Sequence, residues 1–116
     1  MTNLLEETTK ILARHGKSLA DIIWVGCKEF SIPVESFLAL SNKKYNDGYG
    51  KQEVAIDLLV VGNDWWLERH GYDGSEWWEY KEKPHLPAYT ENNVTDIFAD
   101  DGWATLKEIN LEEWGF

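Results

Sequence analysis

The chain contains a single cysteine and no long hydrophobic run. Cys27 therefore has no partner for an internal disulfide, and one thiol cannot supply the ligand cluster of a structural zinc site. A membrane span needs about 20 consecutive apolar residues, and no stretch of the sequence provides them. Residues 1–7 have neither the basic start nor the apolar stretch of a signal peptide. We therefore expect a cytoplasmic protein without a membrane segment.

Common catalytic and nucleotide-binding motifs are also missing. The sequence has no Gly-x-x-x-x-Gly-Lys-Ser/Thr phosphate loop, no Gly-x-Gly-x-x-Gly turn before a helix, no His-Glu-x-x-His zinc motif and no nucleophile elbow. The stretch YNDGYG at residues 45–50 holds two glycines, and we expect it to be a plain connection. The missing motifs favour a protein that is not an enzyme and has no cofactor.

Positive charge is scarce in the second half of the chain. Residues 1–52 hold six acidic and seven basic side chains, whereas residues 53–116 hold fifteen acidic and four basic, so the net charge changes from +1 to −11. Binding a phosphate backbone requires Lys and Arg that release counterions, so we expect no direct contact with nucleic acid. An acidic field attracts basic protein surfaces instead. Solubility alone is the other explanation for such a charge.

Tryptophan, by contrast, is abundant, and four of the seven lie between residues 53 and 81. This stretch predicts an antiparallel meander, because β-branched and aromatic runs alternate with turn-forming residues. The turns are Gly62-Asn63-Asp64 and Asp73-Gly74, the second of which is a strong hairpin signal. The predicted strands are residues 54–61, 65–70 and 77–81.

The Asp73-Gly74 turn fixes the pairing of the last two strands. A two-residue loop places Tyr72 opposite Ser75, and outward from there His70 lies opposite Trp77 and Glu68 opposite Glu79. The predicted core face carries Trp65, Leu67, Trp78 and Tyr80, with Arg69 near its rim. The other face carries Trp66, Glu68, His70, Tyr72, Trp77, Glu79 and Lys81. A three-residue loop would shift this register by one position and exchange the partners.

Two carboxylates directly opposite each other destabilise a sheet unless a cation lies nearby. We therefore predict that the second face binds a partner, through Trp66, Glu68, His70, Tyr72, Trp77 and Glu79. An ordinary solvated face, with Lys81 relieving the repulsion, is the alternative. The Glu68 and Glu79 carboxylates could also serve as acid and base of a hydrolase-like enzyme. Together with His70 they could instead bind a divalent metal, with Asp73 or His85 as an additional ligand.

The remaining elements complete an α+β prediction. Asn3 with Glu6 starts a helix at residues 3–15, and Pro33 starts another at residues 33–42. Residues 22–25 favour a strand, although Ser18 and Asp21 could open a helix, and Cys27 is expected to pack as a small apolar side chain. Helical spacing returns at residues 92–99, whereas residues 103–111 fit a strand or a helix equally.

These elements predict one α+β domain over residues 1–116. Its expected core is an antiparallel meander of three to four strands with two or three short helices packed on one face. We expect residues 88–116 to form a docked extension or to contact a partner, because Trp114 and Phe116 need shelter.

The segment YNDGYG, followed by DWWLER at residues 64–69 and YDGSEWW at residues 72–78 with a Lys-Pro pair beyond, resembles short proteins of phages and prophages of Gram-positive bacteria. The resemblance covers the middle of the chain, and Gly71 departs from it where a Glu is typical. It implies a small accessory protein made inside a bacterial host. Inhibitors of bacterial defence, including anti-CRISPR proteins that occupy basic channels, belong to this group, so the implied partner is a basic surface of a host protein such as a CRISPR effector.

Overall fold

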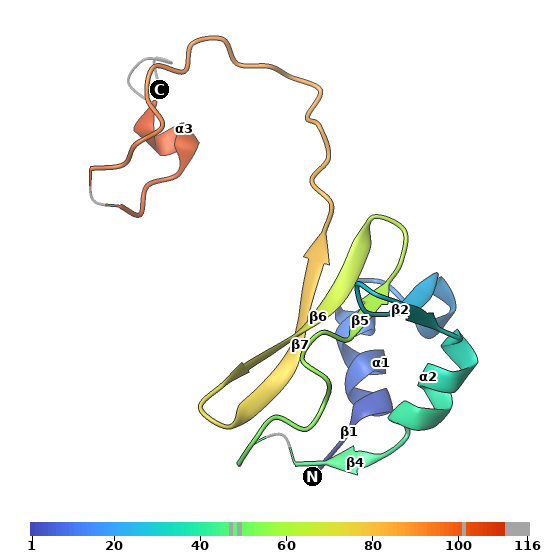
Figure 1. Cartoon of the computed structure of the whole chain (residues 1–116). Coiled ribbons are helices and arrows are strands. Elements are labelled where there is room, and N and C mark those ends of the chain that lie inside the picture. The colour runs from blue at the N-terminus through green and yellow to red at the C-terminus, as the bar shows by residue number, and fades with distance from the viewer. Residues whose placement is uncertain (47, 49, 101, 111–116) are drawn as a thin grey trace. The chain divides into compact units, whose positions relative to one another are not determined.

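The computed structural model describes residues 1–46, 48, 50–100 and 102–110 (Figure 1). The chain divides into two compact units, Met1–Pro84 and His85–Phe116, and each is treated by itself. The predictions for Trp114 and Phe116 fall outside the described residues. Docking of the C-terminal extension stays a prediction.

The first unit is an α+β domain, as predicted. Its main sheet has five strands in the order β3-β2-β5-β6-β7, and every neighbouring pair is antiparallel. The helices are α1 (Leu4–Arg14), the 3₁₀ turn η1 (Leu19–Asp21) and α2 (Val34–Ser41). The strands of the sheet are β2 (Trp24–Gly26), β3 (Ser31–Ile32), β5 (Leu59–Val61), β6 (Trp65–Tyr72) and β7 (Ser75–Glu82). A separate pair joins β1 (Thr2–Asn3) to β4 (Lys44–Tyr45).

Both helices begin where the sequence predicts. The Asn3 side chain accepts a hydrogen bond of 3.0 Å from the Glu6 amide and so caps α1. Gly16, with a φ of +71°, follows the helix end. Pro33 directly precedes α2. Residues 18–25 contain both of the elements that the sequence suggested, a helical turn and a strand. The Ser18 amide donates to the Asp21 carboxylate in the 3₁₀ turn, and the strand β2 follows.

The core lies between the sheet and the two helices, which pack on each other and on one face of it (Figure 1). Leu12 of α1 and Phe37 of α2 meet side chains from the middle of the sheet. A polar contact joins the two layers, since the Trp78 indole donates to the Thr8 hydroxyl over 2.9 Å. The buried cluster consists of Leu12, Ile22, Val25, Phe37, Val60, Trp65, Leu67 and Trp78.

The first strand of the meander is shorter than predicted. Only Leu59–Val61 of residues 54–61 is a strand, because the chain before it forms a turn in which the Leu58 amide donates to the Ala55 carbonyl over 3.2 Å. Upstream, the Val54 amide donates to the Glu76 carboxylate instead of a strand carbonyl. The sheet also has one strand more than expected, since β3 folds back on β2.

The hairpin of β6 and β7 has the predicted register at every pair. Tyr72 lies opposite Ser75, and the pairing continues to Trp65 opposite Glu82. Asp73 and Gly74 have φ values of +51° and +85°, which is the backbone of a type I′ turn and matches the twist of the strands. The two-residue loop therefore holds, and with it the assignment of faces.

The C-terminal unit differs from the prediction. Residues 92–99 are not helical, because the side-chain oxygen of buried Asn110 accepts hydrogen bonds from the Thr95 and Asp96 amides. The Asp96 carboxylate in turn accepts from the Phe98 amide, and these bonds replace the carbonyl partners of a helix. The ambiguous residues 103–111 contain a short helix, α3 (Leu106–Ile109), and Leu111 lies outside the described part.

Candidate functional site

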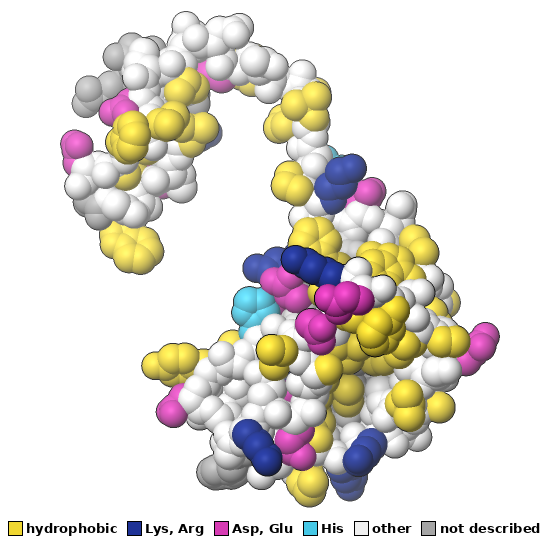
Figure 2. Space-filling model, in the orientation of Figure 1, with side chains coloured by type: hydrophobic (Ala, Val, Ile, Leu, Met, Phe, Trp, Pro, Cys, Tyr) yellow, Lys and Arg dark blue, Asp and Glu magenta, His cyan; other side chains and the backbone are white. Residues whose placement is uncertain are grey.

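The six predicted partner-binding residues lie together on the side of the hairpin away from the helices. We call this surface the outward face, and it also includes Lys81. Trp66, Glu68, His70 and Glu79 are half-buried, whereas Tyr72 is 79% and Trp77 39% exposed. Figure 2 shows acidic, basic and histidine side chains gathered over β6 and β7. None of the six is sealed beneath other elements of the first unit.

Glu68 is the centre of a small network on the outward face. One of its carboxylate oxygens accepts a 3.0 Å hydrogen bond from the Trp66 indole, and the other lies 2.9 Å from Nε2 of His70. The three side chains come from alternate positions of β6, which places them on one face. Glu79 lies directly opposite Glu68, so the bonds to His70 and Trp66 offset the repulsion expected for this pair.

This network should lower the pH at which the Glu68 carboxylate takes up a proton. The hydrogen bond with His70, and then the one from Trp66, hold the pKa of the Glu68 carboxyl below its ordinary value. A carboxyl group whose pKa is lower in the folded state than in the unfolded state stabilises the fold at pH values above its unfolded-state pKa. This stabilisation is lost as the pH falls through the folded-state pKa. His70→Ala should raise the pKa of Glu68 toward the ordinary value, measured from its side-chain carboxyl NMR signal. His85→Ala is the control, and equal pKa values of Glu68 in both variants would contradict the network.

Beneath the hairpin lies a buried ionic cluster that the sequence analysis did not anticipate. Arg69 is not near a rim, since its side chain is fully buried. Its guanidinium donates to Glu76 over 2.6 Å and to Glu7 of α1 over 3.1 Å. It also donates to the Tyr45 hydroxyl and packs over the Trp78 ring, 4.7 Å from the ring centre.

Glu76 ties this cluster to the long connection before β5. Its two carboxylate oxygens accept hydrogen bonds from the Glu53 and Val54 amides. Tyr45 donates to Glu7, and burial, followed by this bond, raises the pKa of the Tyr45 hydroxyl. The strand alternation that places Trp78 inside also places Glu76 inside, so the signal was present in the sequence. The cluster ties the hairpin to α1 and to the connection before β5.

The alternative metal set is not assembled, whereas the acid–base alternative stays a prediction. Among the described residues, Glu68, His70 and Glu79 do not form a group of three ligand atoms within 4.8 Å, although Glu68 and His70 touch. Asp73 belongs to the hairpin turn and joins no such group either. His85 begins the C-terminal unit.

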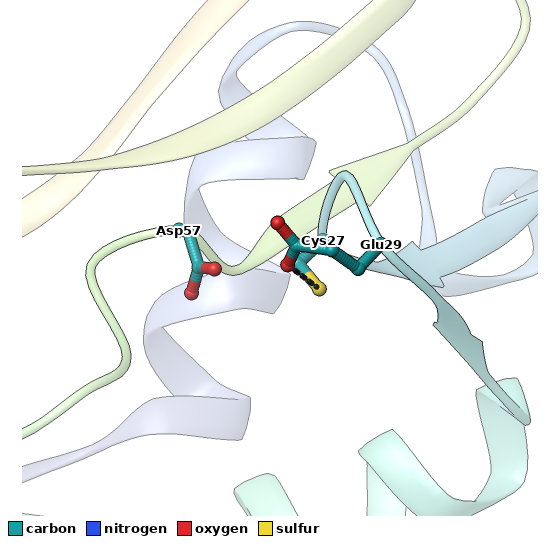
Figure 3. A group of neighbouring side chains, drawn as sticks. All are labelled: Cys27, Glu29 and Asp57. Carbon is teal, nitrogen blue, oxygen red and sulfur yellow. Dashed lines mark hydrogen bonds between the residues drawn. The ribbon is translucent and has the colours of Figure 1, made fainter.

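A different set of potential ligands lies at the other end of the sheet. The thiol of Cys27 and the carboxylates of Glu29 and Asp57 lie within 4.8 Å of one another (Figure 3). Cys27 is half-buried and its thiol lies 3.6 Å from a Glu29 oxygen, so it does not pack as the apolar side chain we expected. Glu29 and Asp57 are exposed. A thiolate with two carboxylates is a donor set that a zinc-like cation can use.

An open groove of about 340 Å³ runs between α1 and β7. Its walls include Lys10 and Arg14 on the helix and both Trp77 and Trp78 on the strand. It therefore connects the outward face to the helical layer.

Neither a membrane-spanning helix nor a known family can be assigned to the described part of the chain. Within the described residues, no helix combines the length and the apolar content needed to cross a bilayer. No protein-family model, curated protein or solved structure matches the chain.

Proposed function

We propose that the protein is a non-enzymatic acidic binding protein whose outward face docks on a basic surface of a partner protein. One observation carries the proposal: indole, phenol and carboxylate side chains share an accessible face of a hairpin that a buried ionic cluster holds rigid. A net charge of −10 supports it, because long-range attraction speeds the approach of a basic partner.

The chemistry of the face suits arginine-rich surfaces. Exposed Trp77 and Tyr72 are residue types that dominate interface energetics. A guanidinium over such a ring gains roughly 0.5–2 kcal/mol. Among the described residues of the first unit, the half-buried Glu79 carboxylate bonds to no cation, so it is available to pair with the same guanidinium.

The proposed partner is a bacterial defence or nucleic-acid-handling protein, such as a CRISPR effector. Two observations support this step, namely the acidic charge and the resemblance of the hairpin sequence to short phage and prophage proteins. The protein would then act as an inhibitor in the cytoplasm of the host by covering a surface that nucleic acid otherwise occupies.

Binding to an arginine-rich peptide tests the surface directly. Trp77→Ala with Glu79→Gln should weaken binding by about tenfold, because an aromatic anchor and a charge are lost together. Tryptophan fluorescence of the full chain gives the dissociation constant. Affinity should fall as salt rises from about 0.01 to 1 M, over which the Debye length drops from about 30 to 3 Å.

The matched control removes an exposed aromatic and an exposed carboxylate elsewhere, with Phe30→Ala and Glu35→Gln. This control should bind like the wild type. Equal loss of affinity in both double variants, or binding indifferent to salt, would refute docking through the outward face.

A further inference from the structure

The outer edge of β7 has no strand beside it in the described part of the chain. β7 ends the strand order of the main sheet and is eight residues long. An edge of this length presents a row of backbone donors and acceptors that can pair with another strand. The groove between α1 and β7 leaves space below the edge at Trp77 and Trp78.

The hydrogen-bonding pattern between β6 and β7 shows which backbone groups of β7 point toward its free edge. The Lys83 amide donates to the Asp64 carbonyl over 2.7 Å. In an antiparallel ladder, hydrogen-bonded pairs alternate with pairs that are not. Residues 77, 79 and 81 therefore bond to β6, whereas residues 78, 80 and 82 direct their amides and carbonyls to the free edge.

We propose that a second copy of the chain pairs with this edge, antiparallel, with Glu79 opposite Lys81 of the second copy. Two-fold symmetry makes this contact twice. The same register places Trp77 opposite Lys83 of the second copy, also twice, which is a cation–π pairing. Both contacts fall at non-hydrogen-bonded positions, where opposing side chains come closest, with Cα atoms about 4.5 Å apart.

The charge pattern selects this register over its neighbours. Sliding the second copy by two residues one way places Glu79 opposite Glu79 of the second copy. Sliding it the other way places Lys81 opposite Lys81 of the second copy. Like charges directly opposite are destabilising. A slip by one residue would set outward side chains against core side chains.

The pairing extends beyond the proposed function and does not depend on it. It would join two five-stranded sheets into one and set the two outward faces side by side. The second copy would then engage Glu79 and Trp77, and a partner would meet Trp66, Glu68, His70 and Tyr72 of both copies.

Charge exchange between two variants tests the proposal. The wild-type full chain should have twice its mass of 13.5 kDa in light scattering. Glu79→Lys and Lys81→Glu should each weaken the dimer by about tenfold or more, because two attractive contacts become repulsive. An equimolar mixture of the two variants should restore the dimer, since both contacts then join opposite charges. Circular dichroism checks that each variant is folded.

Glu35→Lys and Lys51→Glu, which change exposed charges elsewhere, are the matched controls and should leave the dimer intact. A monomeric wild type would overturn the proposal, as would a dimer that tolerates both charge reversals or a mixture that stays monomeric. A monomer whose Trp78 and Tyr80 amides are nevertheless protected from hydrogen exchange would show that another segment of the same chain covers the edge, which also overturns it.

Discussion

Replacing Arg69 by Met is expected to lower the free energy of unfolding by about 3–5 kcal/mol, because it leaves buried carboxylates without their cation. Glu76 is 4% exposed and bonds to Arg69 over 2.6 Å. Glu7 loses its cation as well and keeps only the hydrogen bond from Tyr45. Urea unfolding followed by tryptophan fluorescence measures the effect. Arg14→Met, on the exposed side of α1, is the matched control and should change stability by about 0.5 kcal/mol at most.

The ionic nature of the effect can be isolated with a second substitution. Adding Glu76→Gln to Arg69→Met removes one stranded charge, so the double variant should recover part of the lost stability. The two effects should be strongly non-additive, since the groups share one network. Additive losses would show that Arg69 acts only by filling space.

Trp65→Ala is expected to cost about 3–5 kcal/mol, the usual range for truncating a buried aromatic side chain. Trp65 is 3% exposed and belongs to the core cluster, where its ring also stacks near Tyr80. Thermal and urea unfolding of the variant give the change. A cost of about 0.5 kcal/mol or less, which is usual for substitutions at exposed positions, would contradict the place of Trp65 in the core.

Gly62 provides an independent check on the position of this ring. A Cβ atom at Gly62 would lie 2.0 Å from Cε2 of Trp65, so Gly62→Ala should cost about 1–3 kcal/mol by overpacking. In the Trp65→Ala background the same substitution should cost much less. Gly48→Ala is the control, because nothing lies within 4 Å of its Cβ position. An unchanged cost of Gly62→Ala in both backgrounds would place the clash elsewhere.

The hairpin and its faces were predictable because their determinants are local. The Asp73-Gly74 turn sets the register, and the register sets the face of every residue from Trp65 to Glu82. The capped helix α1 was predictable for the same reason, since Asn3 and Glu6 are neighbours in sequence.

Apart from Cys27, whose thiol meets the nearby Glu29, the failures involve partners distant in sequence. The burial of Arg69 depends on Glu7 and Tyr45, which lie on other elements. The residues before β5 do not continue the strand, and the Val54 amide there bonds to the distant Glu76 carboxylate. The helical spacing of residues 92–99 is overridden by Asn110, fifteen residues beyond Thr95. Local propensity cannot weigh such contacts.

The interleaving of the two sides of β6 and β7 has a consequence for sequence change. Arg69 and Trp78 stabilise the interior, whereas their immediate chain neighbours, such as His70 and Trp77, face solvent. Substitutions at every second codon can therefore alter the proposed binding face while the interior keeps its stability. The outward face can thus change its chemistry through few mutations, each nearly neutral for folding.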